Sequence, residues 1–311
     1  MGYSFSMRHR VLVAFLLTLI AGPACAGGSP PSVLVSIKPV HSLVAAVMEG
    51  VGTPALLIGG AASEHSYALK PSDAHKIATA GLVFWIGPDL ETFLATPLAN
   101  LAADAKVIAL GHANGVHRLT ARAAGLWTAL PKQAAGGRTN PHVWLDPDNA
   151  IAMTRAIAAA LSQADPAHAP RYAANAAKEI GRIGALDRRL AAELAPVRTR
   201  PYIVFHDAYP YFEAHYRLNA IAAVTVEPER PVGPRRIATL RDAIDAGKAL
   251  CIFREPQFSP AVIQTLARGT AARIGVLDPL GADNLAGPDL YPALMSALAG
   301  SLVQCLAAPN P

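Results

Sequence analysis

The stretch DPDNAIAMTRAIAAALSQADPAHAPRYAANAAKEIGRIGALDRRLAAELAPV, residues 146–197, interrupts a regular alternation of short apolar runs and helix-like segments. It carries no strand signal, and each half opens with Asp-Pro, at Asp146 and at Asp165. Asp is a good helix N-cap, and Pro suits the position that follows it. The stretch therefore predicts two consecutive helices, the second of about thirty residues, which is longer than most globular helices.

Short runs rich in Val, Ile and Leu lie on both sides of this stretch, each followed by a helical pattern. Apolar strands that alternate with helices indicate parallel sheets covered on both faces. We therefore predict an α/β fold of two (β/α)4-type lobes with mainly parallel sheets, joined by a long rigid helix. A single (β/α)8 barrel is the alternative, but the helical stretch would interrupt the regular alternation of strands and helices in such a barrel. The runs are 33–37, 55–58, 82–86 and 106–110, then 202–205, 221–226, 249–253 and 274–278.

The N-terminus has the pattern of a secretory signal. Arg8 and Arg10 precede an apolar run that is too short for a permanent membrane anchor. A cleavage site of small residues follows and ends at Ala26. We expect cleavage after Ala26 and export to the periplasm; a buried N-terminal helix or a lipid-anchored Cys25 are the alternatives. The predicted parts are a signal peptide (1–26), an N-terminal lobe (27–147), a helical section with the linker helix (148–197) and a C-terminal lobe (198–311).

Composition and charge exclude several classes of protein. Apolar residues make up 52% of the chain and charged residues 16%, which is typical of a well-packed globular protein. Loss of Arg8 and Arg10 lowers the formal charge from +5 to about +3, too little to indicate nucleic acid. No segment after the signal is identified as membrane-spanning.

Prolines predict helix starts at Pro39, Pro71 and Pro88.

Two cysteines remain once Cys25 leaves with the signal, namely Cys251 and Cys305. A pair in an exported chain is expected to form a disulfide, which would tie a predicted strand to the last helix. By loop entropy such a bridge contributes on the order of 4 kcal/mol to stability. Two free buried thiols are the alternative.

Imidazole and carboxylate side chains follow predicted strands in both halves of the chain, and a further histidine precedes the helical stretch. In open parallel sheets, ligands bind beyond the carboxyl ends of the strands. We therefore expect a binding site in the cleft between the lobes. The candidates are Glu64, His65 and His142 from the first half, and His206 and Asp278 from the second.

Neutral imidazole nitrogens and carboxylate oxygens are ligands of zinc, which usually binds four of them in a tetrahedron. The three histidines would supply three ligands, and Glu64, Asp278 or a water the fourth. The absence of Cys and Met from the set argues against copper(I), whereas nickel or copper(II) fit by affinity alone. Because the ligands must be deprotonated, affinity should fall as pH drops through histidine titration.

The remaining histidines are weaker candidates. Those at 41, 75 and 215 lie within predicted helices, which is typical of ordinary residues on a helix face, and that at 168 lies near a helix start. His112 and His117 lie in an irregular interval up to residue 139, whose composition predicts a mobile surface loop. A weak auxiliary metal contact in that loop is a further possibility.

Five segments carry a family resemblance, and they run in order along nearly all of the mature chain. They resemble segments of the periplasmic solute-binding proteins of bacterial zinc ABC importers (ZnuA-like, metal-binding cluster A-I). The segments are ASEHSYALKPSDAHKIATAGLVFWIGPDLE (62–91), NPHVWLDPDNA (140–150), VFHDAYPYFEAHY (204–216), EPQFSP (255–260) and LDPLG (277–281).

The resemblance implies two lobes bridged by a stiff helix, with one zinc in the cleft bound by His65, His142 and His206. Glu64 falls where some members take a fourth ligand, and Asp278 where relatives, manganese binders above all, use an aspartate. Manganese-type relatives typically have glutamate in place of His206, so a third imidazole favours zinc. The cysteine pair also matches the zinc-type proteins.

The implied function is zinc capture and delivery to an inner-membrane ABC permease with its cytoplasmic ATPase, by a monomer that carries out no chemistry. A manganese- or iron-binding protein of the same fold is one alternative. A periplasmic zinc hydrolase with Glu64 or Asp207 as base is another, although no nucleophile elbow, HExxH motif or phosphate loop is present. The chain departs from many zinc-type members, because its interval between His65 and His142 is basic rather than rich in His and acidic residues.

Overall fold

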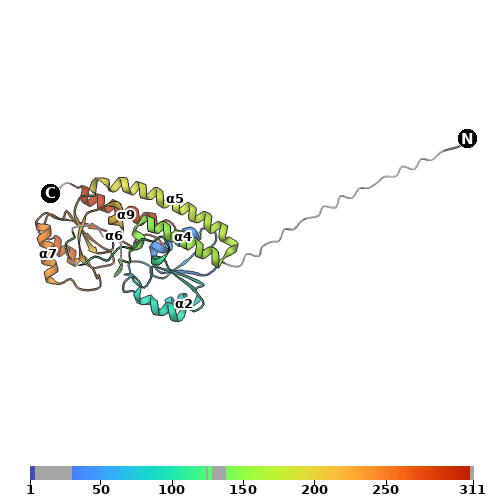
Figure 1. Cartoon of the computed structure of the whole chain (residues 1–311), viewed down its shortest axis with the longest axis horizontal. Coiled ribbons are helices and arrows are strands. Elements are labelled where there is room, and N and C mark those ends of the chain that lie inside the picture. The colour runs from blue at the N-terminus through green and yellow to red at the C-terminus, as the bar shows by residue number, and fades with distance from the viewer. Residues whose placement is uncertain (4–29, 124, 128–137, 309–311) are drawn as a thin grey trace.

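Two separate parallel sheets, each of four strands, form the framework of the molecule (Figure 1). The structure, a computed structural model, describes residues 1–3, 30–123, 125–127 and 138–308, so nearly all of the predicted signal peptide lies outside the described residues. The first sheet has the order β2-β1-β3-β4 and the second β6-β5-β7-β8. This confirms the two-lobed α/β fold and excludes the barrel. The strands are β1 (Val33–Val35), β2 (Ala55–Leu56), β3 (Leu82–Trp85), β4 (Lys106–Ala109), β5 (Tyr202–His206), β6 (Ala220–Thr225), β7 (Cys251–Arg254) and β8 (Arg273–Val276).

The central strands are apolar because both faces of each sheet are covered. Every residue of β1, β3 and β5 is buried, whereas the edge strands β4 and β8 have only exposed and half-buried positions. In parallel sheets of this kind the carboxyl ends of neighbouring strands share one edge. The loops that follow β2, β5 and β8 therefore start from corresponding edges of the two sheets.

Helices surround the two sheets, and proline begins several of them as predicted. The helices are α1 (Lys38–Val47), α2 (Pro71–Thr79), α3 (Ala95–Leu101), α4 (Pro147–Ala164), α5 (Ala169–Leu194), α6 (Pro210–Tyr216), α7 (Pro234–Asp245), α8 (Ala261–Ala267) and α9 (Leu290–Ala307).

The prediction of a helix start at Pro88 is wrong. The buried carboxylate of Glu91 accepts hydrogen bonds from the backbone N–H groups of Ile86 (3.3 Å) and Gly87 (2.9 Å), which holds this segment as a turn. A short 3₁₀ turn follows, and α3 begins only at Ala95.

The two Asp-Pro pairs behave differently. Asp146 caps α4 as predicted, because its side chain accepts a hydrogen bond from the backbone N–H of Asp148 at 2.9 Å. Asp165 makes no such cap; its carboxylate instead accepts from the Tyr172 hydroxyl at 2.8 Å and contacts the His168 ring at 2.7 Å. The second helix therefore opens with a 3₁₀ turn before α5 begins.

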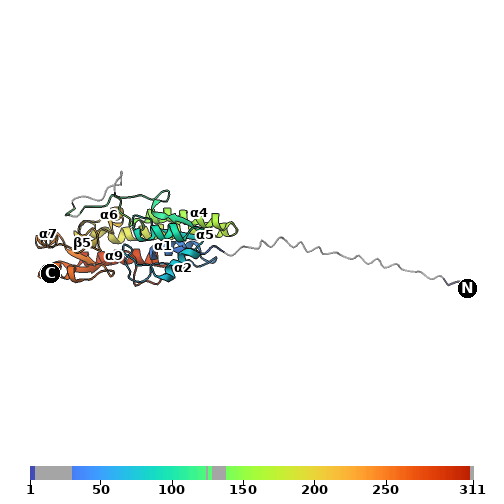
Figure 2. The ribbon, with the colours of Figure 1, turned by 90° about the horizontal axis from the view of Figure 1, so that it is seen from below.

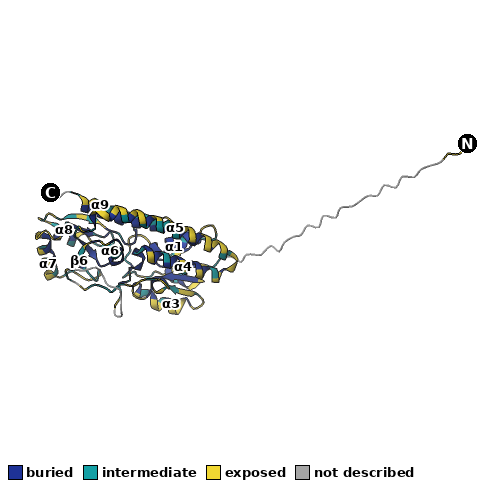
Figure 3. Cartoon of the chain, turned by 45° about the horizontal axis from the view of Figure 1, so that its top comes forward, coloured by how far each residue is buried: buried dark blue, intermediate teal, exposed yellow. Residues whose placement is uncertain are grey.

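The long helix α5, of 26 residues, runs along the flank of the molecule past both sheets (Figure 1). At 1.5 Å per residue it extends about 39 Å. One stripe of its surface is buried and the opposite face is exposed (Figure 3). The stripe includes Tyr172, Ile183 and Leu190, and it packs against α4, α1 and α9.

The hydrophobic core continues from one lobe to the other. A single cluster of buried residues joins β1 and β3 of the first sheet, the helices α1, α4, α5 and α9, and β5 and β7 of the second. These four helices lie grouped together when the molecule is seen from below (Figure 2). A smaller cluster fills the outer part of the second lobe, between its sheet and α7 and α8. The continuous core and α5 oppose a wide hinge motion between the lobes.

Helix α9 is long and apolar enough to cross a membrane by length and composition alone, which was not expected from the sequence. Its apolar character reflects burial, because Leu294, Leu298 and Leu302 are buried in the inter-lobe core and the helix packs on α1 and α5. The predicted disulfide is present: Cys305 of α9 is bonded to Cys251 of β7, with a Cα–Cα distance of 6.3 Å.

Candidate metal centre

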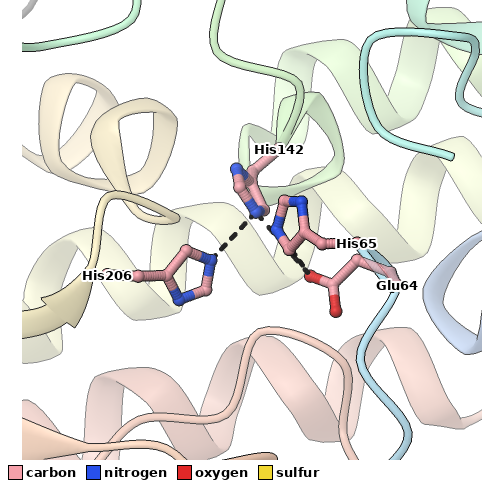
Figure 4. A group of neighbouring side chains, drawn as sticks. All are labelled: Glu64, His65, His142 and His206. Atoms are coloured by element: carbon pink, nitrogen blue, oxygen red, sulfur yellow. Dashed lines mark hydrogen bonds and ion pairs between the residues drawn. The ribbon is translucent and has the colours of Figure 1, made fainter. Parts of the chain in front are cut away.

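Four of the five predicted metal ligands meet between the lobes. Glu64 and His65 come from the loop after β2, His142 from the turn that precedes α4, and His206 is the last residue of β5. Each offers one ligand atom, and these atoms all lie within 4.8 Å of one another. Figure 4 shows the three imidazole rings turned toward one another, with the carboxylate of Glu64 beside them.

The spacing of the ligand atoms suits a single small cation. The Nε2 atoms of His142 and His206 are 3.2 Å apart, and Glu64 Oε1 lies 3.7 Å from the Nε2 atoms of both His65 and His142. Ligands bound tetrahedrally to zinc at about 2.0–2.1 Å are about 3.3–3.4 Å apart. The cage is therefore close to the size that zinc requires.

Two atoms of the cage lack any hydrogen bond within the described part of the chain. They are Glu64 Oε1 and His65 Nε2, and both are buried from solvent. A buried polar atom without a partner is costly, on the order of 1–3 kcal/mol. Since both atoms point into the group of four, a bound cation would supply the partner that each one lacks.

Hydrogen bonds fix the tautomers of two of the rings. His142 Nδ1 donates to the amide oxygen of Asn140 at 2.9 Å, and His206 Nδ1 donates to the Glu255 carboxylate at 2.6 Å. An amide or carboxylate oxygen accepts, so each Nδ1 carries a proton, and in the neutral form of each ring Nε2 presents its lone pair. Partners of this kind orient metal-binding histidines and raise their basicity.

The burial of the site controls the charge of its histidines. Burial, together with the nearby His142 and His206, lowers the pKa of His65 to about 3, although the Glu64 carboxylate opposes this shift. Burial and the neighbouring His206 also bring the pKa of His142 well below its ordinary value. For His206, burial lowers the pKa, but the Glu255 carboxylate outweighs burial and raises it. The rings of His65 and His142 are therefore neutral at neutral pH and can bind a cation without first losing a proton.

Asp278, the fifth predicted ligand, lies outside this group of four. Its carboxylate accepts hydrogen bonds from the backbone N–H groups of Leu280 and Gly281, both at 3.0 Å, and from the Gln257 amide at 2.8 Å. A further bond comes from the backbone N–H of Ala282. Asp278 thus organises the turn after β8, and its role as a ligand stays a prediction.

A cavity of about 290 Å³ opens onto the three imidazoles. Its wall carries charges of both signs from both lobes, so its mouth is polar. The segment after β6 closes one side, where Glu229 accepts a hydrogen bond of 2.7 Å from the Ser63 hydroxyl across the cleft. The cavity lining includes Asp89, Arg122, Arg138, Asp207, Glu227 and Arg230.

The remaining histidines lie outside the group of four. His112 contacts Asp89 at 3.5 Å and Arg118 at 3.2 Å, and the proposed auxiliary metal contact by His112 or His117 stays a prediction. His41, on α1, is buried and bonds to the Pro54 carbonyl at 3.0 Å. His215 is more than an ordinary residue on a helix face, because it lies among the carboxylates of Asp146, Asp148 and Asp187.

Sequence reasoning missed the residues that support the cage. Asn140 and Glu255 lie inside segments that carry the family resemblance, but neither was identified as the partner of a histidine. Glu255 is 49 residues from His206, so only the parallel pairing of β5 with β7 brings them together. Asn140, two residues before His142, could have been found from the short-range contacts that Asn side chains favour.

Known proteins resemble the chain throughout the described lobes. The sequence profile of the family "Zinc-uptake complex component A periplasmic" (ZnuA) matches residues 33–305. The "High-affinity zinc uptake system protein ZnuA" of Brucella abortus is 44% identical, over 90% of this chain and 92% of that protein. The protein of the same name from Yersinia pestis is 35% identical, over 88% of this chain and 91% of that protein.

Solved structures agree with the sequence comparisons. The crystal structure of a zinc-bound ZnuA deletion mutant is 25% identical, with a TM-score of 0.76 over 90% of this chain and 99% of that chain. The periplasmic zinc binding protein TroA of Treponema pallidum, at 20% identity, shares the fold with a TM-score of 0.76 over 89% of this chain and 99% of that chain. The chain belongs to the ZnuA family of periplasmic zinc-uptake components.

Proposed function

We propose that this protein captures zinc in the periplasm and delivers it to an ABC-type permease of the inner membrane. The observation that carries the proposal is the buried cage of three imidazoles and one carboxylate, whose ligand atoms lie within 4.8 Å of one another. The cage has the size and the donor types that zinc uses in proteins. The family membership and the names of the relatives support the same function.

Glu64 is the fourth ligand in this proposal. Its Oε1 atom is buried, lacks a hydrogen bond among the described residues and lies 3.7 Å from two ligand nitrogens. Asp278, by contrast, already accepts four hydrogen bonds. With Glu64 bound, the ion has three nitrogen ligands and one oxygen ligand. Manganese prefers oxygen-rich sites, so this set favours zinc over manganese.

The site binds zinc with little rearrangement of its own side chains. Asn140 and Glu255 hold the rings of His142 and His206 with their Nε2 lone pairs toward the ion. The ion enters through the polar cavity and exchanges its water for these ligands. Since α5 and the shared core oppose wide opening, we infer that small shifts of the lobes or loops release the ion at the permease.

Several finer features belong to the same proposal. The chain loses residues 1–26 on export, works as a monomer, and meets a permease whose cytoplasmic ATPase drives uptake. The four parts are the signal peptide, the two lobes and the helical section between them, with the boundaries given above. The sequence pattern at the N-terminus and the two separate sheets support this division.

The hydrolase alternative receives no support from the site. A catalytic zinc needs an open position for water and a free base nearby. Here Glu64 lies within the ligand group, and Asp207 is engaged by the guanidinium of Arg122. Both bases considered for a hydrolase therefore have other roles.

Calorimetric titration of the exported, metal-stripped protein with zinc tests the proposal. We expect one tight site per chain, with manganese unable to displace zinc at equal concentration. His206→Ala should weaken binding by more than the roughly 10–100-fold typical of losing a supporting residue. His75→Ala is the matched control, because His75 lies on α2 outside the group. Absence of tight zinc binding, or tight binding by His206→Ala, would reject the proposal.

A further inference from the structure

A buried arginine joins the two lobes directly beside the metal site. The side chain of Arg122, which is only 9% exposed, comes from the segment after β4 and reaches the second lobe. Its Nε donates to Asp207 Oδ1 at 2.8 Å, its Nη2 contacts the same oxygen, and its Nη1 forms an ion pair with Glu213 at 2.7 Å. Both carboxylates are buried, and Asp207 is the residue next to His206.

The segment that carries Arg122 is paired with the segment that leads to His142. Thr120 and Thr139 form an antiparallel bridge. On either side of it, the backbone N–H of Ala121 donates to the Arg138 carbonyl at 3.1 Å, and that of Asn140 to the Leu119 carbonyl at 2.9 Å. A displacement of Arg122 would therefore be transmitted to the backbone just before His142.

Asn140 completes a closed ring of interactions around the site. Its Oδ1 accepts from His142 Nδ1 at 2.9 Å, and its Nδ2 donates to the Asp207 carbonyl at 2.5 Å. Arg122 binds the side chain of the same aspartate, and its backbone N–H donates to Asp207 Oδ2 at 3.2 Å. The ring thus runs from Arg122 to Asp207, on to Asn140 and back through the paired backbone, with His142 and His206 attached to it.

The docked segment has further contacts with the second lobe. Trp127 stacks under the guanidinium, with the Arg122 carbon 3.5 Å from the ring centre, and its backbone N–H donates to the Ile221 carbonyl at 2.6 Å. The Tyr211 hydroxyl of α6 donates to the Asn140 carbonyl at 2.7 Å. Arg122 is therefore held in a defined orientation, as a planar guanidinium that binds a carboxylate and stacks on an aromatic ring.

We propose that Arg122 is a positioning residue for zinc capture, which holds the segment that carries His142 against Asp207 and so sets the distance between the Nε2 atoms of His142 and His206. The inference rests on the proposed function and deepens it. Arg122 does not contact the ion; it acts through Asp207 and Asn140. Without it, the two imidazoles no longer have a fixed separation, and the ion loses a preformed cage.

The test must separate this role from simple stabilisation, because Arg122→Met alone leaves two buried carboxylates without their cation. The main variant is therefore the neutral triple Arg122→Met/Asp207→Asn/Glu213→Gln, which removes all three charges together. Arg122→Lys is the second variant, since it retains the charge and loses the planar fork. Arg118→Met is the control, because Arg118 lies in the same segment but bonds only to His112 among the described residues.

Each metal-stripped variant is titrated with zinc, and its cobalt(II) form is examined by visible absorption. We expect the triple variant and Arg122→Lys to bind zinc about 10–100-fold more weakly than the wild type, with faster release. Their cobalt spectra should lose the strong bands of four-coordinate cobalt. Arg118→Met should match the wild type in both measurements.

The outcomes distinguish the inference from the proposed function. If the wild type itself fails to bind zinc, the proposed function fails. If the wild type binds tightly and the folded triple variant shows the same affinity and cobalt spectrum, Arg122 is only structural and the inference is overturned. Should the triple variant not fold, Arg122→Lys decides the question by the same two readouts.

Discussion

His142 Nε2 and His206 Nε2 face each other at 3.2 Å, although the two residues are 64 positions apart and belong to different lobes. Hydrogen bonds to Asn140 and Glu255 place the proton of each ring on the opposite nitrogen. Two imidazole nitrogens at this distance need a proton or a metal cation between them, because two facing lone pairs repel. The relationship explains why the site is built for an ion and why it must be assembled across the cleft.

The fourth ligand can be identified by a pair of isosteric substitutions. Glu64→Gln should weaken zinc binding by about 100-fold or more, because a neutral amide replaces the one carboxylate of the cage. Asp278→Asn should leave the affinity within about threefold of the wild type and lower the free energy of unfolding by about 1–3 kcal/mol through its lost hydrogen bonds. Zinc competition assays and thermal unfolding measure the two effects. The reverse pattern would assign the ligand to Asp278.

Glu255 is expected to tune the affinity without contacting the ion. Glu255→Gln retains an acceptor for His206 Nδ1 but removes the negative charge that makes the ring a better donor to zinc. We predict a 10–100-fold lower affinity, as is typical of such partners. Glu179→Gln on α5 is the matched control, since Glu179 is also a buried carboxylate but pairs with Arg182. Equal affinities for the two variants would contradict the prediction.

The local features of the fold were predictable from the sequence. Buried parallel strands are apolar throughout, and Asp-Pro marked the start of α4 because capping depends on neighbouring residues only. The same rule failed at Asp165, where the Tyr172 hydroxyl and the His168 ring engage the carboxylate. A different rule, that proline suits the first turn of a helix, failed at Pro88, where the buried Glu91 keeps the backbone in a turn. In each case a side-chain contact outweighed the local signal.

The disulfide should contribute to stability and not to zinc binding. Cys251 and Cys305 are separated by 54 positions, so the loop-entropy relation gives about 4 kcal/mol as the stabilisation. Cys251→Ala/Cys305→Ala should therefore lower the free energy of unfolding by up to this amount, with zinc affinity unchanged. Denaturant unfolding and calorimetry provide the two values. A large loss of affinity in the folded double variant would show that the bridge shapes the site.

Because of His215, the metal-free protein should lose stability as the pH becomes alkaline. Burial lowers its pKa, but Asp146 and Asp187 outweigh burial and raise the pKa to about 9, above its ordinary value of 6.5. The stabilisation is therefore complete below about pH 6.5 and is lost as the pH rises through 9.

The measurement for His215 is the unfolding midpoint at a series of pH values. Solvent screening of this partly exposed group reduces the effect of its pKa shift on stability. We therefore expect the midpoint to fall by roughly 2–4 °C between pH 6.5 and 9.5. His215→Gln should lack this part of the decline. An identical pH profile for wild type and variant would mean that the carboxylates do not hold the imidazolium.

The site was predictable only in part, for a physical reason. Glu64, His65 and His206 could be placed because the carboxyl ends of parallel strands gather ligands at one edge, and His142 because it precedes the helical connection between the lobes. Asp278 met the same rule, yet its carboxylate binds backbone groups of its own turn, which no strand pattern reveals. Arg122 came from an interval whose composition predicted a mobile loop; its ordering depends on carboxylates 85 and 91 positions away.

The most direct test is the position of zinc in crystals of the loaded protein, located by anomalous scattering at the zinc edge. The account predicts one strong peak about 2.0–2.2 Å from the Nε2 atoms of His65, His142 and His206 and from one oxygen of Glu64. A peak bound by fewer than two of these imidazoles, or zinc found only elsewhere on the chain, would contradict it.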